Sequence, residues 1–125
     1  GEQEQYQASK RANLQCKEAI EAAVKENFDG RHLNLCAAKG VIQSYGMDRV
    51  SMILASTVQR QDWDGRYSPS NKDWAKTVPF ASPNLDELSL NVHPTVLNGF
   101  ISLVRTEQQL TEAAAQIQNE TELEL

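Results

Sequence analysis

The sequence predicts an all-α fold, a compact bundle of about four helices with one additional short helix. Two observations support this class: apolar residues recur at helical spacing in four segments, and glycine or proline stands where these segments begin or end. A length of 125 residues suits one core, so we expect a single domain over residues 1–125. Its ends, residues 1–6 and 112–125, are polar and are expected to be frayed or extended.

The first two expected helices cover residues 7–27 and 33–44. A glycine follows each of them and supplies the left-handed conformation that ends a helix, Gly30 and Gly46. Each helix also carries one of the two cysteines, Cys16 and Cys36, among apolar residues. Free cysteine is often buried, so we expect both thiols in the core.

The remaining expected helices cover residues 48–60, 69–76 and 94–110. Asp48 is a good N-cap for the first of them, and Ser68 before a proline predicts the start of the short second one. The last begins at a proline, and its apolar pattern weakens beyond residue 110. Gly99 inside it predicts close packing against a neighbour, because glycine is otherwise unfavourable in a helix.

One segment departs from helical periodicity. Leu88, Leu90 and Val92 alternate with polar residues, as in a short strand. A strand needs a partner, so this alternation favours a minor β-hairpin near residues 78–92 beside the helices.

The composition excludes several classes of protein. Hydrophobic residues make up 40% and charged residues 23% of the chain, so it is neither a disordered tail nor a membrane protein. No apolar run approaches the roughly 20 residues that span a bilayer, and no signal peptide is recognisable. Two cysteines without a Cys-x-x-Cys pair do not make a disulfide framework. We therefore expect a cytoplasmic protein without membrane contact.

The charge is distributed unevenly. The net charge is −5 in total, with +1 over residues 1–78 and −6 over residues 79–125. An acidic end of this kind repels nucleic acid and attracts a basic protein, although a solvated helix face has the same composition.

No constellation of residues predicts catalysis. His32 and His93 lie near expected helix starts, where capping or surface roles are common. Asp62 and Asp64 are two residues apart and could hold a metal ion, but Arg66 continues the same spacing and favours a structural ion pair. We expect a protein with no catalytic residue, no metal and no cofactor.

A segment rich in aromatic and charged residues is the candidate partner-binding site. Both tryptophans lie within it, and tryptophan, tyrosine and arginine dominate the energetics of protein interfaces. The alternative is that the rings cover the helical core while the charges pair with one another. The candidate residues are Trp63, Asp64, Gly65, Arg66, Tyr67, Lys72 and Trp74.

These residues also carry a resemblance. The runs 54–59, 62–68 and 71–75 contain Trp-Asp-Gly-Arg-Tyr-Ser, then an asparagine, then Trp-Ala; His93 and a proline follow later. Over residues 14–105 the chain resembles an uncharacterised domain family of conjugative and mobile-element proteins in Gram-positive and gut bacteria. Members are similar to accessory domains found beside helicases and DNA methylases, so the resemblance implies a genomic context and no enzymatic reaction.

Together these observations favour a non-enzymatic protein-binding module of a bacterial mobile element. We expect a counter-defence role in which the module inhibits a host restriction or CRISPR nuclease. A nucleic-acid-binding accessory domain of conjugative transfer and a purely structural or oligomerisation domain are the alternatives. The nucleic-acid alternative would use Arg60, Arg66, Lys72 and Lys76, and it predicts a salt-sensitive affinity.

Overall fold

A computed structural model describes residues 1–61, 65–78 and 85–124, and it confirms the all-α class. Its helices, in chain order, are α1 (Glu2–Asn27), α2 (Ala37–Tyr45), α3 (Met47–Gln61), α4 (Pro69–Thr77), α5 (Leu85–Leu88) and α6 (Pro94–Glu124). The described residues form no strand, and their one extended pairing is an isolated bridge between Phe28 and Leu33.

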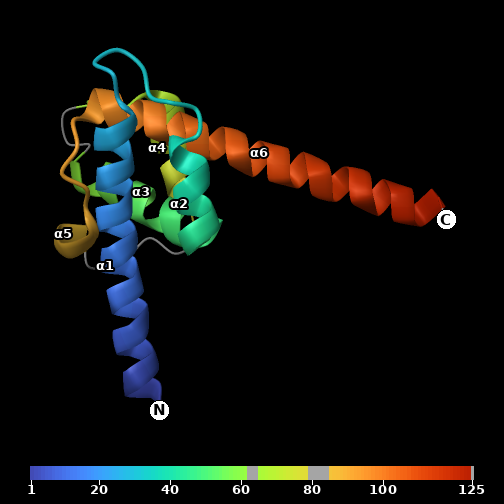
Figure 1. Ribbon diagram of the computed structural model, residues 1–125, viewed down its shortest axis with the longest axis horizontal. Helices are drawn as coiled ribbons and strands as arrows, with labels where there is room; N and C mark the ends of the chain where they lie inside the picture. Colours follow the sequence, from blue (N-terminus) through green and yellow to red (C-terminus); the bar gives the residue numbers. More distant parts are fainter. Residues whose placement is uncertain (62–64, 79–84, 125) are drawn as a thin grey trace.

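Helix α3 lies at the centre of the body and contacts each of the other helices of the described chain (Figure 1). Almost every residue from Val50 to Val58 is buried, including three small polar ones. A helix that is buried on nearly all sides needs apolar or small residues all round, and this stretch supplies them. The largest fully buried side chains around it are Tyr67, Phe100, Ile20, Ile53, Leu54, Leu90, Leu97 and Ile101.

Two helices each extend beyond the body with one of their ends. The first half of α1 projects beyond the body, and α6 runs outward in a different direction (Figure 1). Residues 1–11 of the chain are exposed throughout, and so are residues 109–119. We call residues 1–11 the N-terminal arm and residues 109–124 the C-terminal arm. Both arms are helical in the described structure.

The expected β-hairpin is wrong for the residues that the structure describes near positions 78–92. A short helix, α5, ends at Leu88, and an irregular segment follows it. The backbone of Leu90 bonds to side chains of α3: its N–H donates to Thr57 Oγ1 (3.0 Å), and its carbonyl accepts from Gln61 Nε2 (2.7 Å). Because α3 satisfies these polar groups, the segment is buried without pairing as a strand. Residues 79–84 of the predicted hairpin lie outside the described residues.

Cys36 is exposed, which contradicts its expected burial. Helix α2 begins at Ala37, later than predicted, because Asn34 Oδ1 accepts from the Cys36 N–H (2.9 Å) in a turn before the helix. Cys36 is thus the N-cap residue, and Ala37 and Ala38 take the buried positions. Gly46 ends α2 with φ of 89°, as predicted, and α3 begins directly after it.

Candidate functional site

The candidate segment, in its described part, is a capped helix tied to α6. Ser68 Oγ accepts from the backbone N–H of Asn71 (3.2 Å), and Pro69 stands at the first helical position. This is the predicted start of α4. The cap orients α4 so that its inner face lies against α3 and α6.

Tyr67 is an inward-facing residue of this segment. Only 1% of it is exposed, and its hydroxyl donates to Gln61 Oε1 at 2.9 Å. Gln61 in turn donates to the carbonyl of Leu90. A buried phenol with a satisfied hydroxyl fixes the loop to the core, so the tyrosine contributes architecture here.

Asn71 and Asn98 form the centre of a polar network between α4 and α6. Asn71 Nδ2 donates to Asn98 Oδ1 (2.8 Å), and Asn71 Oδ1 accepts from Arg105 NH1 (3.1 Å). Asn98 Nδ2 donates to the Arg66 carbonyl at 3.3 Å, which leaves the exposed Arg66 side chain on the outside. The bond from Arg105 to Ser70 Oγ (2.6 Å) extends this network to the surface.

Trp74 is half-buried and packs against the core. Its indole Nε1 donates to Gln108 Oε1 at 3.0 Å, and Gln108 Nε2 donates to Ser51 Oγ at 3.4 Å. The indole therefore joins α4, α6 and the beginning of α3, with part of its ring still accessible.

The predicted site residues thus divide into two groups. Tyr67 and Trp74 hold the segment to the body, whereas Gly65 and Arg66 are exposed and Lys72 is half-buried. Trp63 and Asp64, with Asp62, lie outside the described residues. The partners that organise the segment are Gln61, Asn98, Arg105 and Gln108, which sequence reasoning missed. The available signal was that Asn98 interrupts an otherwise apolar helix face.

A groove runs along α4 beside the last turns of α3. It encloses about 430 Å³, and Lys72 and Lys76 carry its positive charge against Asp73. Its other lining residues are Val58, Gln59, Pro69 and Ala75. The groove is the one cavity described here that a predicted site residue lines, and its net charge of +1 is small for a phosphate track.

The C-terminal arm is exposed at every residue from 109 to 119. Leu110 and Ile117 are 59% and 64% exposed, and a separation of seven residues places them on one helix face. Ala113 and Ala114 lie between them on the same side. The only charged residues in this arm are glutamates. It therefore presents a narrow apolar stripe on an acidic helix.

No group of three His, Cys, Asp or Glu among the described residues could hold a metal ion. Cys16 is fully buried, and this burial raises the pKa of its thiol to about 12, with a smaller opposing effect of Arg49. A thiol with this pKa stays protonated and is a poor nucleophile at neutral pH.

The two histidines lie in turns. The backbone N–H of His32 donates to Asp29 Oδ1 (2.7 Å), as does that of Arg31 (2.8 Å), and these two bonds lower the pKa of the Asp29 carboxyl. His93 Nδ1 accepts from the N–H of Thr95 at 3.2 Å, which is the capping role that its position predicts. Both residues therefore have a local structural function.

Comparison with known protein families shows the family to which this chain belongs. A family model described as "Protein of unknown function (DUF3849)" matches residues 1–109, which is most of the chain. The chain belongs to the DUF3849 family. The expected membership in an uncharacterised domain family is confirmed, and the match ends where α6 leaves the body. No curated protein and no solved structure matches the chain.

The described helices also bear on the membrane question. None of them combines the length and the apolar character that crossing a bilayer requires.

Proposed function

We propose that this DUF3849 protein is a non-enzymatic protein-binding module whose C-terminal arm docks on a basic surface of its partner. The observation that carries the proposal is the exposed pair Leu110 and Ile117 on an acidic helix whose residues 109–119 are all exposed. Apolar side chains of this size, aligned at helical spacing, are the usual anchors when a helix binds in a groove.

The charge distribution supports a partner with a basic surface. Residues 1–105 contain twelve basic and twelve acidic residues, so this part of the chain is formally neutral. Residues 106–125 contain five glutamates and no lysine or arginine, and they account for the whole net charge of −5. A partner with a basic patch would therefore be attracted to the arm, and salt would weaken that attraction.

Helix energetics supports the same partner. The last turn of α6 has no basic residue, and the sequence places glutamates at this C-terminal end, where the helix dipole is negative. A helical segment of this length without tertiary packing is only marginally stable in water. Cationic side chains of a bound partner would stabilise both the charges and the helix, so binding and ordering are coupled in this proposal.

Nuclease inhibition in the cytoplasm fits this chemistry. Enzymes that cleave nucleic acid carry basic substrate channels, to which an acidic helix is complementary. The resemblance of the Trp-Asp-Gly-Arg segment to mobile-element proteins supports a role in protecting transferred DNA. Within the proposal, the partner is thus a host restriction or CRISPR nuclease.

The test compares two double variants that each add two negative charges to the arm. Leu110→Glu with Ile117→Glu removes the apolar stripe, whereas Gln109→Glu with Gln116→Glu has the same spacing on a different face. The probes are a purified restriction endonuclease and a purified CRISPR effector, assayed for DNA cleavage and for binding at low and high salt.

We expect the stripe variant to lose at least about tenfold in affinity and inhibition, and the control to stay near wild type. Binding should also weaken as salt rises. If neither nuclease is bound or inhibited by the wild type, the nuclease assignment is wrong. If a basic partner binds both variants equally, the arm is not the docking element.

A further inference from the structure

A cavity lies where the N-terminal arm leaves the body. It encloses about 490 Å³ between α1 and the corner that joins α2 to α3. One wall is Ser9 and Asn13 of α1, and the opposite wall consists of the corner and the first turns of α3. The lining residues from that side are Tyr45, Gly46, Met47, Asp48, Arg49 and Met52.

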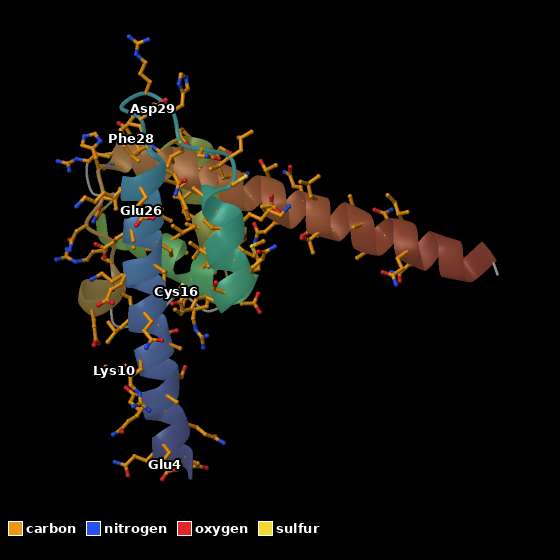
Figure 2. All side chains as sticks on the ribbon, in the orientation of Figure 1. Glu4, Lys10, Cys16, Glu26, Phe28 and Asp29 are labelled. Carbon is orange, nitrogen blue, oxygen red and sulfur yellow. The ribbon has the colours of Figure 1, made fainter. Side chains whose placement is uncertain are left out.

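An exposed aromatic residue stands on the α1 face that forms this wall. Tyr6 is 63% exposed, and it precedes Ser9 by three residues and Asn13 by seven. These spacings put all three on one side of the helix. Cys16, three residues after Asn13, continues the same side and is buried, so the core-facing stripe of α1 extends past the end of the body. Figure 2 labels Cys16 on the part of α1 that lies against the body.

We propose that the N-terminal arms of two copies pair antiparallel, so that Tyr6 of each copy occupies this cavity of the other. The arm and the cavity share one helix face. A twofold axis near the middle of the arm therefore makes the surface self-complementary, because each copy supplies both the projecting ring and the cavity that receives it. With Tyr6 opposite Ser9, the register places residue 2 of one copy opposite Asn13 of the other.

Charge complementarity favours this occupant. In the proposed register the Glu2 carboxylate of one copy lies opposite Asn13 of the other, whose Oδ1 accepts from Arg49 Nε at 2.9 Å. An arginine has five N–H donors, so a carboxylate can bond to the same guanidinium. Asp48 also lines the cavity, and its negative charge repels the Glu2 carboxylate of the other copy. Because attraction to Arg49 and repulsion by Asp48 partly cancel, salt should change the dimer affinity only modestly.

The cavity walls suit a tyrosine ring. Met47 and Met52 are flexible, polarisable side chains that adapt to an inserted aromatic group. Ser9 and Asn13 offer polar atoms near the phenolic end, and Arg49 offers a cation for the ring face. Arms of this length bury little area, so the dimer should be weak and concentration-dependent.

The experiment measures the monomer–dimer equilibrium of the whole chain by sedimentation at several concentrations. Tyr6→Ala removes the inserted ring, and Ser9→Arg fills the cavity from an exposed position. Gln7→Ala is the matched control, since it lies on the same arm but on another face. Circular dichroism and thermal melting check that every variant folds.

We expect a wild-type dimer, and we expect Tyr6→Ala and Ser9→Arg each to weaken it at least about tenfold while Gln7→Ala leaves it unchanged. Glu2→Arg should also weaken it, and mixing that variant with Arg49→Glu should restore a heterodimer. A wild type that is monomeric at all concentrations, or a dimer that ignores Tyr6→Ala, overturns the proposal.

The outcome is independent of the proposed function. A dimer lost on Leu110→Glu with Ile117→Glu, but retained on Tyr6→Ala, would assign self-association to the C-terminal arm and refute this pairing. Loss of nuclease binding with an intact Tyr6-dependent dimer would leave the present inference standing.

Discussion

Replacing Asn71 with alanine tests whether the motif segment is architecture. Asn71 is 2% exposed, and its side chain makes two bonds, one to Asn98 and one to the charged Arg105. A neutral bond contributes about 1 kcal/mol and a bond to a charged group about 2 kcal/mol. Both partners keep another bond, Asn98 from the Ser68 N–H and Arg105 to Ser70, so neither is orphaned and the loss falls to about 2 kcal/mol.

Alanine also returns part of this loss, because it is a better helix former than asparagine by about 0.6 kcal/mol. The net decrease in the free energy of unfolding is therefore about 1.5 kcal/mol. For a chain of this size that corresponds to a melting temperature lower by roughly 5–7 °C. Urea denaturation followed by circular dichroism measures the free energy, and calorimetry measures the melting temperature.

Two further variants serve as controls for the Asn71→Ala measurement. Asn71→Asp retains an acceptor for Arg105 but places a second acceptor against Asn98 Oδ1, so it should also destabilise the protein. Ser102→Ala removes an exposed hydroxyl that bonds only within its own helix, and it should have almost no effect. If Asn71→Ala stays within about 0.5 kcal/mol of the wild type, the network does not hold α4 to α6 and the argument fails.

Four other predictions concern individual residues. Only Cys36 should react with a thiol reagent in the native protein, and both thiols should react after unfolding. Burial raises the pKa of the Cys16 thiol to about 12, so the unfolded chain loses this proton at a lower pH than the native protein does. The free energy of unfolding should therefore fall as pH rises above about 8.5. In urea melts at several pH values, Cys16→Ala should make this decrease smaller. Gly99→Ala should stabilise the protein by about 0.5–1 kcal/mol in the same assay, since its methyl group would lie 3.5 Å from Leu33 Cδ1 in ordinary contact. The lowered pKa of Asp29 means that the turn it caps keeps its bonds at neutral pH and loses them as pH falls through that pKa, which an NMR titration of the carboxyl will detect.

Function remains tied to the two arms in both proposals. The body is formally neutral and its described polar groups are largely satisfied internally, with no buried side-chain nitrogen or oxygen lacking a partner in the described part. The arms instead expose Tyr6, Leu110 and Ile117. Both proposals therefore rest on exposed side chains of helices that leave the body, the kind of anchor used when a helix binds in a groove.

Local signals were read correctly from the sequence. The start of α4 at Ser68 and Pro69 and the start of α6 at Pro94 follow from capping and from the fixed φ of proline, which involve only neighbouring residues. The end of α2 at Gly46 has the same local cause. The fold class was equally accessible, because helical periodicity records which face of each segment avoids water.

Side-chain partners across the fold were not accessible in this way. Trp74 and Gln108 are 34 residues apart, and nothing near either one in the chain indicates that they bond. Leu90 shows the same limit: its strand-like alternation is real, but α3 supplies Thr57 and Gln61 as partners and removes the need for a second strand.

The amino-acid sequence by itself determined the helical class, most helix boundaries and the acidic C-terminal end, since short-range sterics, caps and composition set all three. Only the tertiary structure decided that Tyr67 faces inward, that Cys36 faces solvent, and that Ser9 and Asn13 line a cavity. The physical reason is that burial is a property of the packed assembly: a residue's exposure depends on which distant helices cover it, and those contacts form only when the whole chain folds.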